Sequence, residues 1–540
     1  MVNNSVNLFL LLQLSLALYF SLKYSFIQDD AFISFRYSKN LVNGHGLVYN
    51  PGGEKVEGYT NFSWVLLMAL AMKLGLDPVN ASKTIGIISY LLMIVVANFL
   101  CYWLIVKNKN QRVGWLTILP LIALLLIPLN KSSASWATGG LETSFFTLLV
   151  VAAFVLVFLL EDIKKPSFWL GFNILLIILC LTRPEGIFFA AMVNVYAWWR
   201  LHSSDSSWWR SAIEIIKRNL LLIFALLIYV GWKIIYYRSI LPNTFYVKGT
   251  ENLFGLGLTY FYYYLKSYPY LIVSFLVVFC QAVVILFRHW KQKNKTTNEE
   301  KLYFVLVVSI IIFLIYVIRI GGDYLEYRPL TYIYPLLIIS SCLLTILWLG
   351  RKNYFDAAAF LLLSWALMII PVSHLQYPSQ YGVVSTETLY EQQFFYDKWG
   401  LIGVALKKIL PKDTIISTIT AGAIPYYSDL FTIDQFGLND WEVAHGESTT
   451  GMLKAGHRKG ALGDYLLRRG VNLMIDYPTI YPCDHPRVYN PWSLNAPNVF
   501  IRIDGNNCLR TLYLTPKDSL SKYFKSHPEQ FIVRLPPGVK

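Results

Sequence analysis

The sequence predicts a polytopic α-helical membrane protein with an α/β domain at its C-terminal end. Hydrophobic residues make up 55% of the 540 residues and charged residues only 15%, whereas soluble domains carry about 25% charged residues. Aromatic residues reach 16%, as expected where Tyr and Trp rings lie at headgroup depth. Polar residues become frequent after Pro371. This change divides the chain into a membrane part, 1–371, and an α/β domain, 372–540.

Eleven apolar segments are long enough to be membrane spans, which need about 20 mostly apolar residues. The first of them lacks a preceding basic region and a following small-residue cleavage site, so we interpret it as a retained helix and not as a signal peptide. The predicted spans are 6–22, 83–106, 113–129, 141–160, 167–181, 186–200, 219–237, 269–288, 302–320, 331–349 and 354–371.

A shorter apolar segment, Phe62–Leu76, has two possible placements. If it crosses the membrane, the loop Lys107–Arg112 and every later basic loop face outward. If it lies along the interface, all these loops face the cytoplasm, as the positive-inside rule requires. We therefore expect a cytoplasmic N-terminus, eleven spans, and a first outer loop, 28–80, that contains juxtamembrane helices.

This topology places the polar motifs between spans on the outer face, whereas the inner loops are plain basic linkers. Because the motifs share one face, the simplest interpretation is a one-sided active site. The net charge of +15 then reflects cytoplasmic loops next to anionic lipid, and we expect no nucleic-acid partner. The outer motifs are 28–61, 131–142, 182–186, 241–246 and 321–328.

Two adjacent carboxylates, Asp29 and Asp30, follow the first span directly. Ionisable residues beside hydrocarbon are costly, so a cluster there indicates a functional site. Neighbouring side chains point in different directions, so the two carboxylates have different tasks. One is a candidate general base for an acceptor hydroxyl, and we favour Asp29 slightly because it is closer to the span. The alternative is an interfacial anchor or a solvated loop.

Twelve further residues carry side chains suited to phosphate oxygens or sugar hydroxyls. Each also has a simpler interpretation as an interfacial or solvent-exposed side chain. Asn61, which precedes the shorter apolar segment, is expected to cap its helix. The candidate donor phosphate- or sugar-binding residues are Arg36, His45, Glu57, Tyr59, Arg183, Glu185, Asn243, Lys248, Asp323, Arg328, His457 and Lys459.

The C-terminal region predicts both strands and helices. Ile415–Thr420 and Val471–Ile475 have the composition of buried strands, and Tyr390–Ile409 that of a helix ended by a proline. Cys483 and Cys508 lie in this polar region, and a disulfide between them is plausible if the region is extracytoplasmic. The other four cysteines lie in apolar segments and are interpreted as small core residues.

Three stretches of the first outer loop, Asp29–Tyr37, Asn43–Gly52 and Val56–Trp64, together resemble the GT-C superfamily of polyprenyl-phosphate-sugar-dependent glycosyltransferases. The likeness is greatest to the branch of the terminal β-(1→2) arabinofuranosyltransferases and related lipopolysaccharide-locus proteins. It extends to about residue 475, and 476–540 matches no part of it. Further motifs follow in the order of that branch at 140–143, 183–186, 241–246, 321–324, 422–428 and 456–459.

The resemblance implies a GT-C fold with a periplasmic or extracellular C-terminal domain, in a bacterial inner (cell) membrane. It implies a polyprenyl-phosphate sugar donor, a glycan or glycolipid acceptor on the outer face, and a catalytic aspartate at Asp29 or Asp30. Arabinofuranose is one candidate sugar; the alternative is a hexose or aminosugar transferred to lipopolysaccharide or protein. Some members use a divalent metal ion, for which Asp29, Asp30 and Glu57 are the candidate ligands.

A different class of function is a transporter or flippase for a lipid-linked sugar. Transporters often show internal repeats and ionisable residues near the bilayer midplane. The charged motifs of this chain lie at one face and no repeat is visible, which favours the transferase. Membrane lipids are expected partners in either case.

Overall fold

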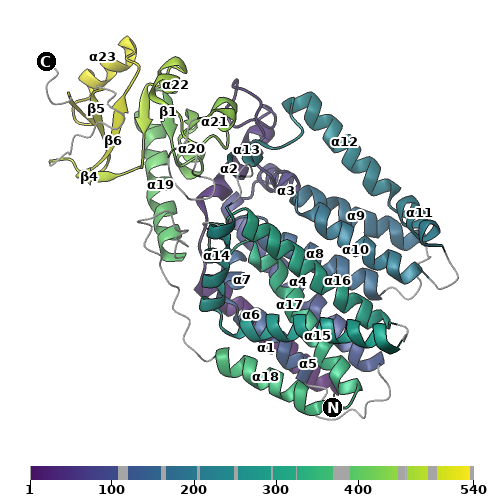
Figure 1. Cartoon of the computed structure of the whole chain (residues 1–540). Helices are drawn as coiled ribbons and strands as arrows, with labels where there is room; N and C mark the ends of the chain where they lie inside the picture. The colour runs from purple at the N-terminus through teal and green to yellow at the C-terminus, as the bar shows by residue number, and fades with distance from the viewer. Residues whose placement is uncertain are drawn as a thin grey trace.

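A computed structural model describes residues 2–107, 119–159, 166–202, 207–248, 253–292, 296–323, 325–368, 389–447, 450, 457, 459–484 and 496–535. A helical body occupies most of the molecule, and a mixed sheet with its helices lies at one end of it (Figure 1). The polytopic helical fold with a C-terminal α/β part is therefore the one that the sequence predicts. The predicted boundary at 371/372 lies outside the described residues.

Within these ranges, six helices are long and apolar enough to cross a membrane. They coincide with predicted spans and establish a multi-pass membrane protein. They are α1 (Val2–Lys23), α4 (Pro78–Lys107), α12 (Leu220–Tyr237), α15 (Tyr270–Gln292), α16 (Asn298–Arg319) and α17 (Leu330–Gly350).

Four more predicted spans are helices of 15 to 17 residues: α8 (Thr143–Leu159), α9 (Pro166–Thr182), α10 (Gly186–Leu201) and α18 (Tyr354–Met368). The predicted span 113–129 differs, because its described part is two short helices, α5 (Leu119–Leu124) and α6 (Leu126–Leu129). Residues 113–118 lie outside the described residues.

The shorter apolar segment forms α3 (Phe62–Lys73), a helix of 12 residues. At 1.5 Å per residue it is about 18 Å long, well short of the ~30 Å hydrocarbon core. Its length therefore agrees with the interfacial placement. It packs against α2 (Asp29–Val42), so the segment between α1 and α4 folds into a pair of helices beside the membrane part.

The helical body is built around α17, whose side chains are buried along nearly its whole length. Helices α5, α8, α15, α16 and α18 all pack against it. By contrast, α12 exposes most of its apolar side chains, as a helix at the lipid boundary does. The remaining helices of this part are α7 (Lys131–Trp136), α11 (Trp208–Arg218), α13 (Asn243–Lys248) and α14 (Phe254–Ser267).

The C-terminal part is a seven-stranded mixed sheet in the order β2-β1-β3-β6-β5-β7, with β4 also paired to β6. The predicted strands are present as β1 and β3, which pair in parallel. The predicted helix is present as α19 (Leu389–Ile409). The strands are β1 (Ile415–Thr418), β2 (Phe431–Asp434), β3 (Leu473–Ile475), β4 (Ile480–Pro482), β5 (Asn498–Asp504), β6 (Asn507–Tyr513) and β7 (Phe531–Arg534). The other helices are α20 (Ala423–Ser428), α21 (Trp441–His445), α22 (Gly463–Arg468) and α23 (Asp518–Ser526).

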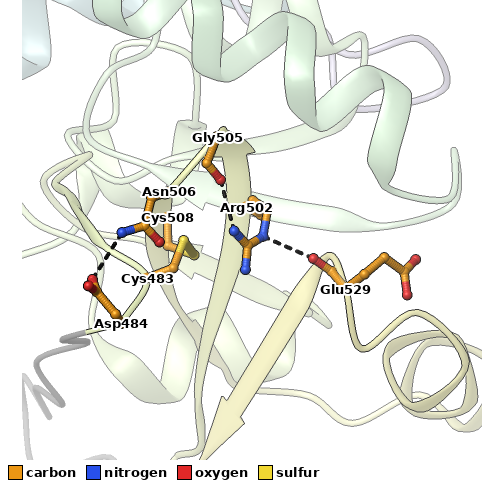
Figure 2. Close-up of a disulfide and its surroundings, with 7 residues drawn as sticks. All are labelled: Cys483, Asp484, Arg502, Gly505, Asn506, Cys508 and Glu529. Carbon is orange, nitrogen blue, oxygen red and sulfur yellow. Dashed lines mark hydrogen bonds between the residues drawn. A yellow bond between two sulfur atoms is a disulfide. The ribbon is translucent and has the colours of Figure 1, made fainter.

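Cys483 and Cys508 form a disulfide with their Cα atoms 5.2 Å apart. Figure 2 shows it between the end of β4 and the start of β6, close to the turn in which Gly505 accepts a hydrogen bond from Arg502. Both cysteines are buried. The bond closes a loop over a sequence separation of 25 residues, which contains residues 485–495, outside the described ranges.

Replacing Cys508 by Ser is expected to destabilise the C-terminal part by about 3 kcal/mol, because a loop of this length gains conformational entropy in the unfolded chain. Thermal unfolding of the purified full chain, with and without reductant, measures the effect. Cys280→Ser, which removes an exposed free thiol, is the matched control and should leave the transition unchanged. Equal unfolding temperatures for the Cys508 variant and the wild type would contradict this prediction.

Candidate active site

A cavity of about 280 Å³ lies where the α1–α4 segment meets the segments that follow α9, α12 and α16. Many of the outer motifs therefore meet in one place, although they are far apart in the sequence. The lining residues are Asp30, Ile33, Ser34, Gly58, Tyr59, Thr60, Asn61, Leu141, Glu142, Arg183, Pro184, Glu185, Leu241, Pro242, Thr244, Phe245, Lys248, Tyr316, Ile320, Gly322, Asp323, Arg328, Pro329, Tyr332 and Leu438.

The first charged group of the cavity is centred on Arg183, between α9 and α10. Its guanidinium pairs with Glu142 and, at 3.0 Å, with Glu185. Burial opposes the positive charge, but the carboxylates of Glu185 and Glu142 hold the pKa of Arg183 above its ordinary value. Burial likewise acts to raise the pKa of Glu185, but Arg183 holds it below the ordinary range. Both members of the pair therefore stay ionised.

The second charged group follows α16. Arg328 pairs with Asp323, its Nη2 atom lying 2.9 Å and its Nε atom 3.1 Å from the same carboxylate oxygen. The left-handed backbone of Gly321 and Gly322 (φ +89° and +77°) turns the chain sharply between α16 and this pair. The cavity thus holds two buried guanidinium groups, each anchored by a carboxylate.

The two adjacent aspartates of α2 point in different directions. Asp30, Ile33 and Ser34 line the cavity, which is the spacing of one helix face. The Asp29 carboxylate accepts hydrogen bonds from the backbone N–H of Gly422 (3.1 Å) and Ala423 (2.7 Å) at the start of α20. A Cβ at Gly422 would lie 2.0 Å from the Asp29 carbonyl oxygen. Only glycine allows this close approach.

The slight preference for Asp29 as the base rested on its proximity to the first span, and the structure gives the two carboxylates different surroundings. The Asp29 carboxylate contacts the C-terminal part, and Asp30 is the one that lines the cavity. In a helix the direction of the side chain, and not its position along the axis, decides which surface it reaches.

Arg36 also lies away from the cavity. Its guanidinium is buried and donates to the carbonyl oxygens of Tyr49 (2.7 Å) and Leu430 (2.8 Å), to that of Pro425, and to Asn50 Oδ1 (2.9 Å). These partners belong to both parts of the chain. Arg36 thus holds the C-terminal part against α2, and is not placed to bind a ligand in the cavity.

Asn243 has a similar structural role. Its side-chain amide donates to the carbonyl oxygens of Gly437 (2.6 Å) and Asp440 (2.9 Å) in the C-terminal part. Its neighbours Thr244, Phe245 and Lys248 line the cavity on the other face of α13. The C-terminal part therefore positions one wall of the cavity, to which it also contributes Leu438.

Glu57 is buried and forms an ion pair with Lys233 of α12, 2.7 Å away. Burial raises the pKa of its carboxyl, and Lys233 opposes this. The three carboxylates considered as metal ligands are thus directed to different partners: Asp29 to α20, Glu57 to α12 and Asp30 to the cavity. Among the described residues no three His, Cys, Asp or Glu side chains gather as a metal site, so the residues present do not fit the metal hypothesis.

Of the remaining candidate residues, some line the cavity and others lie away from it. Tyr59 and Lys248 line the cavity. His45 is exposed in a turn, as its simpler interpretation expected. His457 packs against Phe436, with ring centroids 4.8 Å apart, and the ammonium of Lys459 donates to the Gly446 carbonyl oxygen. These three residues do not line the cavity.

Asn61 and Glu142 line the cavity but were not among the candidates. The Asn61 amide nitrogen donates to Glu142 at 2.6 Å, and its oxygen accepts from Ser34 at 3.1 Å. Its side chain does not cap α3, so the capping interpretation is wrong. Glu142 belongs to the motif at 140–143. A single carboxylate before an apolar helix does not indicate that it forms an ion pair with Arg183. The chain Ser34–Asn61–Glu142–Arg183 connects the helix of Asp30 to the first guanidinium.

The cavity has a polar floor and an apolar rim. Leu241, Phe245 and Tyr316 line it and are 39%, 44% and 41% exposed. Tyr316 ends a row of exposed apolar side chains on one face of α16, at the spacing of successive helical turns. The row consists of Val308, Ile311, Ile312, Ile315 and Tyr316. The rim is therefore continuous with the surface that α16 presents to lipid.

The chain is similar in sequence to known proteins. The chain is 23% identical over 342 residues, 56% of its length, to the terminal β-(1→2)-arabinofuranosyltransferase of Corynebacterium glutamicum. It spans about half of that relative, 46% of its length. A family model described as a domain of unknown function (DUF8728) matches residues 384–522.

The chain is also similar to solved structures. The Archaeoglobus fulgidus oligosaccharyltransferase in its apo form aligns with 89% of this chain and 70% of its own, at 8% identity and a TM-score of 0.50. ArnT from Cupriavidus metallidurans aligns with 94% of this chain and 99% of its own, at 11% identity and a TM-score of 0.49. In sequence the chain resembles the GT-C superfamily of glycosyltransferases, and its fold is the GT-C fold, a polytopic helical membrane part followed by an α/β part.

Proposed function

We propose that the protein is a membrane glycosyltransferase that moves a sugar from a polyprenyl-phosphate donor to a cell-envelope glycan or glycolipid on the outer face of the membrane. The observation that carries the proposal is the division of the cavity into a charged floor and an apolar, lipid-facing rim. A donor of this class has the matching division, with a phosphosugar at one end and a hydrocarbon chain at the other.

The donor phosphate is assigned to the two guanidinium groups. Arg183 and Arg328 lie at the polar floor, and arginine forms paired, charge-assisted hydrogen bonds with phosphate oxygens. As the bond between the sugar C1 and the phosphate oxygen breaks, its electron pair passes to that oxygen. Two fixed cations stabilise the developing negative charge at no cost of reorganisation. Glu142, Glu185 and Asp323 hold the guanidinium planes in place.

Asp30 is assigned as the general base. As the acceptor oxygen bonds to C1, its hydroxyl proton passes to the Asp30 carboxylate, so that charge and atoms balance over the transfer. A carboxylate positioned at a reacting hydroxyl contributes roughly 10²- to 10⁴-fold to rate. Asn61 and Ser34, both at the cavity, fix the distance between the helix of Asp30 and the cation Arg183.

The hydrocarbon chain is assigned to the rim formed by Leu241, Phe245 and Tyr316, and from there to the apolar face of α16. This route lets the phosphosugar reach the floor while the chain stays in the bilayer. It also explains why an envelope enzyme needs no nucleotide sugar, which is not supplied outside the cytoplasm. Arabinofuranose is the sugar favoured by the arabinofuranosyltransferase relative; a hexose or aminosugar is the alternative.

A transfer assay tests the proposal. The full chain is reconstituted in liposomes with radiolabelled polyprenyl-phosphate arabinofuranose, hexose and aminosugar in separate reactions, together with cell-envelope extract as acceptor. We expect one of the donors to label an envelope product, at a rate that saturates with donor concentration. Linkage analysis of that product then identifies the bond that was formed. Movement of intact donor across the bilayer without product, in place of transfer, would identify a flippase and contradict the proposal.

A further inference from the structure

We propose that Tyr332 is a ligand-binding residue whose hydroxyl donates a hydrogen bond to a phosphoryl oxygen in the cavity. This inference rests on the proposed function. It adds a hydrogen-bond donor that lies outside the sequence motifs considered above. Tyr332 lies in the first turn of α17 and lines the cavity beside Arg183 and Arg328.

The environment of the hydroxyl is the first argument. Tyr332 is 0% exposed, and its hydroxyl has no hydrogen-bond partner among the described residues. Leaving a buried hydroxyl unpaired costs roughly 1–3 kcal/mol, whereas Phe would fill the same space without that cost. Of the neighbouring tyrosines of α17, Tyr334 illustrates the usual outcome, since its hydroxyl donates to the Leu126 carbonyl oxygen 2.5 Å away. Tyr332 differs in facing the cavity.

The charges around the ring are the second argument. The Arg183 guanidinium lies over the Tyr332 ring, 5.4 Å from its centroid, and Arg328 lines the same cavity. Arg183 uses three of its five N–H donors for Glu142 and Glu185, so the guanidinium keeps donors for an anionic ligand. A phosphoryl group offers several strong acceptor oxygens for the two guanidinium groups and one hydroxyl.

The ring is fixed in place, which is the third argument. Phe146 of α8 packs edge-on against Tyr332, with centroids 4.9 Å apart and planes at 76°. Nearly all side chains of α17 are buried as well, so close packing restricts this ring. The Tyr332 hydroxyl is therefore preorganised as a hydrogen-bond donor, and a preorganised side chain loses little conformational entropy when it binds a charged ligand.

Measurements of lipid binding distinguish contact with the ligand from a purely structural role of Tyr332. Dissociation constants for undecaprenyl phosphate and for the uncharged undecaprenol are measured with the full chain in nanodiscs. Tyr332→Phe is expected to weaken binding of the phosphate about 10- to 100-fold, the size of a hydrogen bond to a charged group. Binding of the alcohol should stay unchanged, because the hydrocarbon chain contacts the rim and not the floor.

Tyr260→Phe is the matched control. Its hydroxyl is also buried and has no hydrogen-bond partner among the described residues, but Tyr260 does not line the cavity. This variant should bind both lipids as the wild type does. Equal affinity of Tyr332→Phe and wild type for undecaprenyl phosphate would overturn the inference about Tyr332 alone. A wild type that does not distinguish the phosphate from the alcohol would overturn the proposed donor as well.

Discussion

Replacing Asp30 by Asn is expected to lower the transfer rate roughly 10²- to 10⁴-fold, because the amide cannot accept the proton of the acceptor hydroxyl. Asp30 lines the cavity, so the substitution alters the reacting surface and leaves the contacts between α2 and α20 in place. The unfolding temperature should therefore stay close to that of the wild type. Initial transfer rates in liposomes measure the loss of activity, and thermal unfolding in detergent measures the unfolding temperature.

Asp29→Asn provides a control one residue away, with the opposite pattern. The Asp29 carboxylate accepts two backbone N–H groups of α20, and an amide would turn its NH₂ group toward one of them. We expect a loss of about 1–3 kcal/mol in stability and a transfer rate within a few-fold of the wild type. Large rate loss in Asp29→Asn together with full activity in Asp30→Asn would reverse the assignment of the base.

Replacing Arg183 is the second substitution with a large expected effect. Arg183→Lys keeps the charge, but one ammonium cannot hold Glu142 and Glu185 and also offer two parallel donors to a phosphate. We expect transfer to fall about 10- to 100-fold. Arg183→Gln removes the charge, and its transfer rate should fall further. It also leaves two buried carboxylates without their partner, which costs about 3–5 kcal/mol of stability.

A double variant separates these two consequences. Arg183→Gln combined with Glu185→Gln removes one of the uncompensated carboxylates and should recover part of the lost stability without recovering transfer. Arg468→Gln, which breaks an exposed ion pair with Glu442 on the C-terminal part, should change neither quantity. Recovery of transfer in the double variant would mean that Arg183 acts only by holding the fold together.

Composition and hydrophobic pattern were sufficient for the architecture. The six described helices that are long and apolar enough to cross a membrane coincide with predicted spans, and the predicted strands pair as β1 and β3, because lipid and a buried sheet each impose a simple apolar pattern. The segment 113–129 was predicted less well. Its composition is that of a span, but Pro120 and Pro128 stand within the region where the described helices are short, and proline disfavours a continuous helix.

The motifs correctly indicated which loops form the cavity, but not which side chains face it. The sequence does not reveal that Arg36 and Asn243 contact carbonyl groups of the C-terminal part, because those partners lie about 200 to 400 residues away. Nor does it reveal that Glu57 meets Lys233, a cation inside an apolar segment. Lys233 was itself a usable signal, since an ionisable residue in a span needs a partner.

Asn61 and Tyr332 were missed for different reasons. Asn before an apolar run has a strong local explanation as a helix cap, and this explanation concealed its bonds to Glu142 and Ser34. Tyr332 is one of 37 tyrosines, and its position among them is distinguished only by the cavity and the arginines around it. Both are properties of the tertiary structure.

Photocrosslinking with a lipid-phosphate probe tests the central claim, that this cavity holds a polyprenyl-phosphate group at its charged floor. A polyprenyl phosphate carrying a diazirine close to the phosphate is bound to the full chain in nanodiscs and irradiated. Mass spectrometry of the peptides then locates the adducts. We expect them on the segments that contain Leu241–Phe245 and Tyr316–Ile320, and we expect excess undecaprenyl phosphate to abolish them. Adducts spread over the exposed face of α12, unaffected by the competitor, would contradict the claim.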